Sequence, residues 1–434
     1  MKVGMRNKKG GYQDSKKRQD EENKSIRFAA WLGSNHGILC ILTTIVALFP
    51  VSCNYIMTGG IVQEWIFRVE ELAGGLQKGC FYLYPNLNVL SMIGIYENAM
   101  NSNFWFLVPG FLYGLTKNIV LSYRLYMLAV QIITFLTASL FFLHLFGQDG
   151  RLAACMGIVL YMTNPYRIYV CYDHANLSQA TAWMLLPLYA WAMYTLTAPG
   201  KKVGKLLVAG ASLAFLGYAD VIFFLTAAGI TLLVAIISRR GSFCFAVMSG
   251  GILFFPGLYR LCRYLFTEDF IEWNIPLQMI MGKGYRFGQF FSSYAFRDGK
   301  PGMGLGMMIC LLAAVWMRFV YREGEKDKGK RGFLYIALFL SVLSLSSFPW
   351  DVLQRLGNWA VRLISLINTP SVFWGMAIAA FCIPAAAGME RLFKGKDRTA
   401  AIVTLAAAVL LCVGICVYQC NMLTYTRLPL ELGG

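Results

Sequence analysis

The chain has 434 residues, of which 57% are hydrophobic and only 14% are charged. Water-soluble domains usually carry about a quarter charged residues, so a very hydrophobic soluble enzyme is disfavoured and a protein embedded in a bilayer is expected. The formal net charge of +17 is compatible with nucleic acid binding, but the distribution of the charges along the chain argues against it.

The first 28 residues are basic and contain no apolar stretch. They hold nine Lys or Arg residues and four acidic residues. This composition is typical of a disordered cytoplasmic tail. No small-residue cleavage site closes the apolar run that follows, so we interpret that run as a retained membrane anchor.

Eleven apolar windows follow the tail, and most approach the length of a membrane-spanning helix. They lie at 29–51, 123–146, 152–171, 177–197, 205–219, 221–237, 242–258, 304–321, 333–348, 372–388 and 400–420. The predicted fold class is all-α, a polytopic membrane helix bundle of about 11 spans occupying 29–420. A cytoplasmic N-terminus then leaves a short outer tail at 421–434 and an extracellular C-terminus.

The placement of charges supports this orientation. Segments assigned to the cytoplasm hold 25 Lys or Arg and 10 Asp or Glu residues, whereas segments assigned outside hold 12 of each kind. Cytoplasmic loops of membrane proteins carry an excess of Lys and Arg. Basic runs such as 326–331 therefore indicate topology, and nucleic acid is not expected as a partner.

The cytoplasmic loops are short, so chemistry is expected in the long outer segments 52–122, 259–303 and 349–371. In the first of these, 61–78 predicts an amphipathic helix lying at the membrane interface. Glu64, Arg68 and Glu71 share its polar face at helical spacing. Its carboxylates are candidates for a catalytic base, and a solvated ladder of ion pairs is the alternative.

A second interfacial helix is predicted at 350–367. Asp351, Arg355 and Arg362 recur on its polar face, and apolar residues cover the opposite face. Two arginines on such a stripe suit a lipid phosphate. Ordinary contact with lipid headgroups is the alternative.

Two further acids, Asp173 and Asp220, occupy very short outer turns between spans. Such a turn places a carboxylate at the mouth of the bundle, where acids are often functional. The alternative is an aspartate that merely stabilises a turn. Arg167, near the outer end of its span, and Arg260 with Arg263 are placed to neutralise an acid or a phosphate.

Recognised catalytic and metal-binding motifs are absent from the sequence. The three histidines are too scattered to predict a metal site. Cys412, Cys416 and Cys420 form a helical stripe that favours helix contact over ligation. Cys53 and Cys80 both lie in an outer segment and could form a disulfide, which the sequence does not decide.

Two stretches carry a resemblance to a known family. They are LYMTNPYRIYVCYDHANLSQATAWMLLPL at 160–188 and FPWDVLQRLGNWAVRLISLINTPSVFWGMA at 348–377. Together with one span, a long outer loop containing an amphipathic helix and many spans joined by short turns, they resemble the GT-C glycosyltransferase superfamily. More narrowly, they are similar to YfhO-like multi-span membrane proteins, and the resemblance covers roughly 30–390 of the chain.

The resemblance implies transfer of a sugar from a polyprenyl-phosphate donor to an acceptor on the outer side. It also implies an acid in the first outer loop that acts as a base or binds a metal. No Asp occurs in 52–122, and Glu64 is the nearest substitute. A divalent cation is compatible with this chemistry, but the sequence identifies no metal ligands.

Our leading hypothesis is a GT-C-like transferase that acts on a cell-surface glycan or lipid acceptor. The candidate catalytic acids are Glu64, Asp173 and Asp220. The candidate contacts to substrate or phosphate are Arg68, Arg167, His174, Arg260, Arg263, Asp351, Arg355 and Arg362. The alternatives are a flippase or other transporter of lipid-linked glycans, and a non-catalytic membrane partner. The sequence does not determine the sugar, the acceptor or the oligomeric state.

Overall fold

The computed structural model describes residues 36–52, 56, 61–81, 83–84, 101–147, 150–197, 202–266, 279–292, 301–320, 328–367, 370–394 and 398–426. Within these residues the regular structure is helical, apart from an isolated bridge between Tyr285 and Leu345. The prediction of an all-α fold is therefore confirmed for this part of the chain. The predicted basic tail and Cys53 lie outside the described residues.

The principal helices are α2 (His36–Leu48), α3 (Val62–Gln77), α5 (Leu107–Thr116), α6 (Ile119–Phe146), α7 (Arg151–Met162), α8 (Pro165–Ile168), α9 (Leu177–Thr195), α10 (Lys202–Ala219), α11 (Val221–Ser238), α12 (Gly241–Leu253), α13 (Phe255–Phe266), α14 (Leu305–Val320), α15 (Lys328–Ser344), α16 (Trp350–Leu353), α17 (Asn358–Ile367), α18 (Ser371–Lys394) and α19 (Arg398–Thr426). Shorter turns are η1 (Phe49–Ser52), the π-helical η2 (Tyr169–Asp173), η4 (Met281–Lys283), η5 (Phe287–Phe291) and η7 (Gln354–Leu356).

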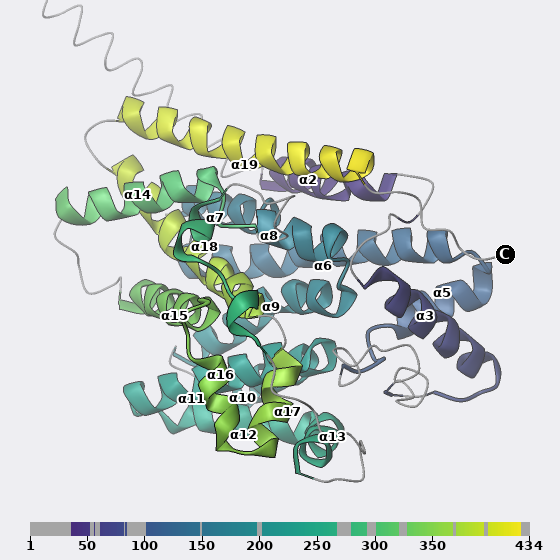
Figure 1. Ribbon diagram of the computed structural model, residues 1–434. Coiled ribbons are helices and arrows are strands. Elements are labelled where there is room, and N and C mark those ends of the chain that lie inside the picture. Colours follow the sequence, from purple (N-terminus) through teal and green to yellow (C-terminus); the bar gives the residue numbers. More distant parts are fainter. Residues whose placement is uncertain are drawn as a thin grey trace, which may run out of the picture.

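Each of the eleven predicted spans coincides with one helix or with a broken helix. Among the described residues, α6, α11, α18 and α19 are by themselves long and apolar enough to cross a bilayer, and the bent pair of α12 and α13 is a fifth candidate. Figure 1 shows α6 and α19 running in nearly the same direction across the view, with α2 beside α19. The chain is a membrane protein, and the sidedness of its termini stays a prediction.

Helix α18 lies at the centre of the bundle, where it contacts α7, α14 and α15. Its apolar window is 94% buried inside the protein, whereas that of α19 is only 28% buried. Trp374 of α18 is fully buried and stacks on Phe290, with ring centroids 4.0 Å apart. The exposed apolar face of α19 is of the kind that lipid acyl chains cover.

The predicted span at 152–171 is wrong as a continuous helix, because α7 ends before Asn164 and a new helix starts there. The Asn164 side chain accepts hydrogen bonds from the amides of Tyr166 at 2.9 Å and Arg167 at 3.4 Å. Asn is a strong N-cap, and Pro165 occupies the first helical position, where no amide hydrogen is needed. The Asn-Pro pair therefore breaks the helix inside the bundle.

Glycines divide two other predicted helices. The helix predicted at 350–367 is interrupted at Gly357, whose φ of 134° and ψ of 175° are accessible essentially only to glycine. The span predicted at 242–258 ends at Phe254, where α13 leaves α12 at 83°. Gly257 lies directly against the Phe254 ring, and a Cβ atom there would overlap it.

The long segment 52–122 contains α3, as predicted, and also α5, which was not predicted. The two helices pack together, with Gly110 of α5 against Leu72 of α3. Helix α6 begins at Ile119, earlier than predicted, because the Asn118 side chain caps it by accepting a hydrogen bond of 3.0 Å from the Leu121 amide.

Candidate functional site

Arg68 projects from α3 into the protein, and the residue is only 1% exposed. Its Nε and Nη2 donate to the Asn103 Oδ1 atom at 3.1 and 2.9 Å, and Nη2 also donates to the carbonyls of Asn101 at 2.9 Å and Ser102 at 3.2 Å. The guanidinium carbon lies 4.6 Å from the centroid of the Phe106 ring. Arg68 therefore fixes the segment 101–103 against α3.

Glu64 lies one helical turn before Arg68 on the same side of α3. Its Oε1 is 3.9 Å from Arg68 Nη1, and Glu64 is 3% exposed. Burial lowers the pKa of Arg68 to about 10, and the charges of Glu64 and Glu71 act in the opposite direction. The alternative of a solvated ladder is therefore wrong for Glu64 and Arg68, and it is Glu70 that lies exposed on this helix.

The segment 101–103 also contacts the turn between α10 and α11. Asn101 Oδ1 accepts a hydrogen bond of 3.0 Å from the Val221 amide. The Ser102 hydroxyl donates to the Tyr218 carbonyl at 3.1 Å. This segment thus connects Arg68 to the turn that carries Asp220.

Asp220 is the N-cap of α11 and is 3% exposed. Its Oδ1 accepts hydrogen bonds from the amides of Ile222 at 2.8 Å and Phe223 at 3.1 Å, and its carboxylate is also hydrogen-bonded to the Asn101 side chain. Burial raises the pKa of Asp220 to about 6, and these hydrogen bonds act to lower it. The Asp220 carboxylate therefore stabilises a turn, which is the alternative interpretation of its sequence position.

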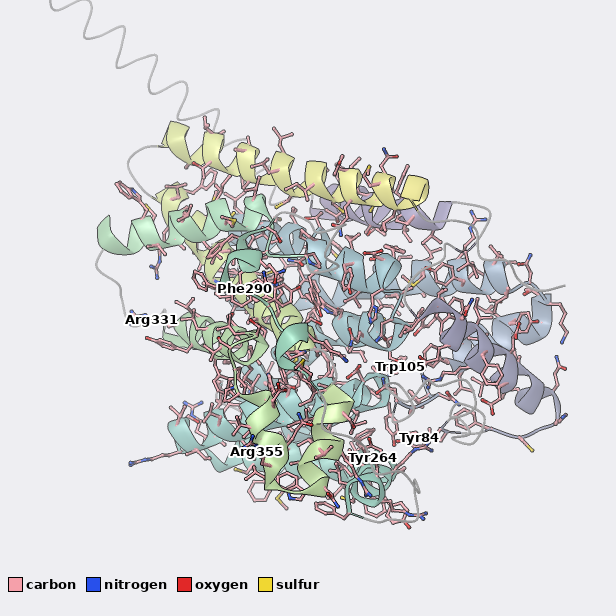
Figure 2. All side chains as sticks on the ribbon, in the orientation of Figure 1. Tyr84, Trp105, Tyr264, Phe290, Arg331 and Arg355 are labelled. Carbon is pink, nitrogen blue, oxygen red and sulfur yellow. The ribbon has the colours of Figure 1, made fainter. Side chains whose placement is uncertain are left out.

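Arg260 of α13 reaches the same region. Its guanidinium carbon lies 4.7 Å from the centroid of the Tyr84 ring, and its charge interacts with that of Arg68. Burial and the neighbouring Tyr218 raise the pKa of Tyr84, whereas Arg260 opposes this shift. Figure 2 labels Tyr84 in the same part of the view as Tyr264 of α13. We name Glu64, Arg68, Asn101, Ser102, Asn103, Asp220 and Arg260 the α3 cluster.

The turn carrying Asp173 and His174 adjoins the start of α3. The His174 carbonyl accepts a hydrogen bond of 3.2 Å from the Ile61 amide, and the His174 ring stacks on Tyr169 with centroids 5.7 Å apart. Burial lowers the pKa of His174, and the Asp173 charge opposes that shift. Ala175 has a positive φ of 50°, which is uncommon for a residue with a side chain. A backbone hydrogen bond therefore joins the Asp173 turn to the start of α3, the helix that carries Glu64 and Arg68.

Arg167 lies inside the bundle, so its predicted place at the mouth of the bundle is wrong. It is fully buried, its Nη1 donates to the Met162 carbonyl at 2.8 Å, and its Nη2 donates to Gln131 Oε1. Gln131 belongs to the middle part of α6 and donates to the Tyr172 hydroxyl at 3.0 Å. Arg167 thus braces the break between α7 and α8.

The other predicted phosphate contacts form a second group around α13, α16 and α17. Arg362 donates to the Tyr264 carbonyl at the end of α13 at 3.0 Å, and the Asp351 carboxylate accepts a hydrogen bond of 3.0 Å from the Ile280 amide. Arg362 therefore connects α17 to α13, and Asp351 connects α16 to the residue before η4. Arg355 is exposed and Arg263 is half-buried at the surface.

Sequence reasoning missed Tyr84 and the segment 101–103, although that segment is the centre of the α3 cluster. The available signal was a run of three small polar residues followed by Phe104, Trp105 and Phe106. Such a run offers amide and carbonyl groups beside aromatic surface. Only the tertiary structure brings it to Arg68, which lies 33 to 35 positions earlier.

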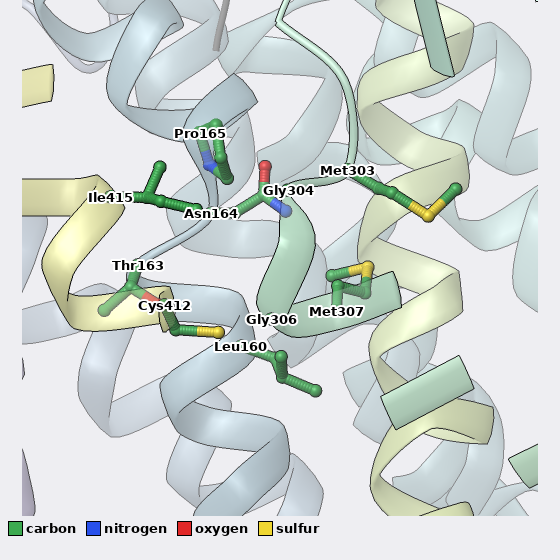
Figure 3. Close-up of a pocket in the computed structure, with 10 residues that line it drawn as sticks. All are labelled: Leu160, Thr163, Asn164, Pro165, Met303, Gly304, Gly306, Met307, Cys412 and Ile415. Carbon is green, nitrogen blue, oxygen red and sulfur yellow. The ribbon is translucent and has the colours of Figure 1, made fainter. Parts of the chain in front are cut away.

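A small crevice lies away from the α3 cluster, at the break between α7 and α8 (Figure 3). Its volume is about 10 Å³, which is room for one water molecule. The lining residues are Leu160, Thr163, Asn164, Pro165, Met303, Gly304, Gly306, Met307, Cys412 and Ile415. Across the described ranges, no group of three or more His, Cys, Asp or Glu side chains is arranged to hold a metal ion.

Comparisons with known proteins give similarity to solved structures but not to family models or curated proteins. No protein-family model matches the sequence, and no curated protein matches it. Among solved structures, the chain is similar to the crystal structure of ArnT from Cupriavidus metallidurans bound to undecaprenyl phosphate. The TM-score is 0.49 and the sequence identity 13%, over 89% of this chain and 75% of that one.

Proposed function

We propose that this protein is a membrane glycosyltransferase of the GT-C type, which transfers a sugar from a polyprenyl-phosphate donor to a glycan or lipid acceptor on the outer side. The observation that carries this proposal is the buried pair of Glu64 and Arg68 on α3, together with Arg260, whose charge interacts with that of Arg68. A carboxylate paired with one guanidinium group, whose charge interacts with that of a second, combines a base with cations that attract phosphate.

In the proposed reaction, an acceptor hydroxyl attacks the anomeric carbon of the donor sugar. The bond between that carbon and the phosphate oxygen breaks, and polyprenyl phosphate leaves with the bonding electrons. Glu64 takes the proton of the hydroxyl. Among the three predicted acids, Glu64 suits this role best because it is paired with Arg68, whereas Asp220 already caps α11 and Asp173 belongs to a turn next to the start of α3.

Arg68 and Arg260 have different roles in the proposed reaction. Arg68 uses Nε and Nη2 to hold 101–103, so only Nη1, which faces Glu64, is directed toward the proposed reaction centre. Arg260, which lies over the Tyr84 ring, is the second candidate contact for the departing phosphate. Positive charge held in place before the reaction stabilises a developing phosphate dianion.

The test is a release assay in proteoliposomes. Purified protein is given a panel of polyprenyl-phosphate sugars together with candidate acceptors, and free polyprenyl phosphate is measured because every donor sugar yields it. Glu64→Gln is expected to lower release at least about 100-fold, within the range of a lost general base. The matched control is Glu70→Gln, an exposed position on the same helix, which should leave release unchanged.

Both variants must remain monodisperse and melt within a few degrees of the wild type. Undiminished release by a folded Glu64→Gln protein would reject the catalytic assignment. No release by the wild type with any donor of the panel would reject the transferase function itself.

A transporter of lipid-linked glycans is the second candidate, and one observation favours it. The helix broken at Asn164 places the buried Arg167 at Gln131, well inside the bundle. Broken helices and buried charges are common at transporter sites. A flipping assay with a fluorescent lipid-linked glycan separates the two candidates, because a transporter moves the lipid without releasing polyprenyl phosphate.

A further inference from the structure

Helix α13 leaves the bundle at the level where the neighbouring helices end. The Tyr218 hydroxyl, near the end of α10, donates to the Leu253 carbonyl at 2.9 Å. The Phe254 ring packs against Tyr218 and also against Phe224 in the first turn of α11. The bend of 83° between α12 and α13 therefore lies beside the turn between α10 and α11. Helix α12 packs against α10 and α11, so α13, which leaves it at 83°, runs across the ends of these helices.

The outward face of α13 is apolar along its whole length. Phe255, Tyr259 and Phe266 are 62%, 57% and 69% exposed. Cys262 is exposed between them. This stripe continues the lipid-type face of α12, where Phe245 and three other apolar side chains are exposed. The exposed apolar surface of α12 thus continues around the bend onto α13.

The bend is held in place by contacts on the inner face of α13. Arg362 of α17 donates to the Tyr264 carbonyl at 3.0 Å, and the hydroxyls of Tyr264 and Ser365 are 2.9 Å apart. On the neighbouring elements Val352, Leu356 and Trp359 are also exposed. The outward face of α13 is therefore part of a wider aromatic and apolar surface at this end of the bundle.

Basic residues flank this apolar face. Arg260 and Arg263 lie at its edge, α13 has no acidic residue, and Arg355 lies on η7, which contacts α17, the neighbour of α13. Aromatic rings with neighbouring arginines are typical of the boundary between acyl chains and headgroups. At 12 residues, α13 measures about 18 Å, which is too short to cross a hydrocarbon core of about 30 Å.

We propose that α13 is an interfacial anchor that lies in the plane of the membrane. Its partner is the phospholipid leaflet: the stripe of Phe255, Tyr259 and Phe266 enters the upper part of the acyl chains, and Arg263 contacts lipid phosphate. This assignment differs from the predicted span at 242–258 and does not depend on the proposed catalytic function. It fixes the depth of the α3 cluster at the membrane boundary, because Arg260 belongs to the same helix.

Photo-crosslinking in nanodiscs tests this proposal with the full chain. Tyr259 is replaced by p-benzoylphenylalanine, which preserves an aromatic ring at an exposed position. The positive control carries the crosslinker at Phe245 on α12 and the negative control carries it at Lys78, an exposed residue after α3. After illumination, phospholipid adducts are located by mass spectrometry.

We expect position 259 to form lipid adducts with a yield within about twofold of position 245, attached to the glycerol-proximal half of the acyl chain. Adducts at the chain ends would mean that α13 is part of a broken span and would overturn the proposal. Absence of lipid adducts, or a crosslinked dimer in their place, would overturn it as well.

The headgroup contact is tested in the same nanodiscs with equimolar phosphatidylglycerol and phosphatidylcholine. A basic residue near an anionic surface favours the anionic lipid by about fivefold. Arg263→Gln should therefore lower the enrichment of phosphatidylglycerol adducts at position 259 by about that factor. An unchanged enrichment would reject the contact between Arg263 and lipid phosphate.

Discussion

Replacing Arg68 by lysine keeps the positive charge but should release the segment 101–103 from α3. The guanidinium reaches three acceptors through two nitrogen atoms, and a lysine has one nitrogen at its end. About two hydrogen bonds to a charged group are lost, at roughly 1.5 kcal/mol each or more. The expected cost is about 3 kcal/mol, which corresponds to roughly a 100-fold change in the local opening equilibrium.

The Val221 amide provides the readout, because it donates to Asn101 Oδ1 at 3.0 Å and is protected only while 101–103 is docked. Hydrogen exchange followed by mass spectrometry should show about 100-fold faster exchange at this amide in Arg68→Lys. The matched control is Arg355→Lys, the same substitution at an exposed position, for which exchange should stay within about twofold. Equal exchange in the two variants would refute the conclusion that the guanidinium holds the segment.

Three further predictions concern stability, measured as Tm in detergent. The folded pKa of Asp220 is raised to about 6 from 3.8, so the stability that its protonated form contributes is fully present below pH 3.8 and is lost as pH rises through 6. Asp220→Asn keeps a capping side chain and should therefore gain Tm relative to the wild type between pH 4 and 7. A difference in Tm that stays constant over this range would contradict the raised pKa of Asp220. Gly357→Ala should lower stability by about 1–3 kcal/mol because of its φ of 134°, whereas Gly74→Ala, in a helix with open space around it, should be neutral or stabilising. Asn164→Ala removes the cap of α8 and should cost about 1 kcal/mol, so a Tm equal to that of the wild type would argue against that cap.

The α3 cluster shows which features residue spacing predicts and which it does not. Spacing along the helix correctly predicts that Glu64 and Arg68 share one side of α3, because residues four apart are neighbours on any helix. It does not predict that this side is buried. The segment that covers it lies more than thirty residues later, and helical periodicity contains no information about contacts at that separation.

The group around α13, α16 and α17 likewise has features that the sequence predicts and features that it does not. The pattern of 350–367 predicts an amphipathic element, which the structure contains, but the break at Gly357 depends on a backbone conformation that a helical pattern does not record. The bend between α12 and α13 cannot be predicted from hydrophobicity either, because both helices are apolar and differ only in direction.

The sequence by itself determined that this is an all-helical membrane protein and where most of its helices lie, because the bilayer requires long apolar helical segments whatever their partners. It also supplied a set of candidate acids and arginines. Only the tertiary structure decided which of them meet. Arg68 joins Glu64 to Asp220 through 101–103, whereas Arg167 turns inward to Gln131. The physical reason is that a buried charge must find hydrogen-bond partners, and here those partners come from distant parts of the chain.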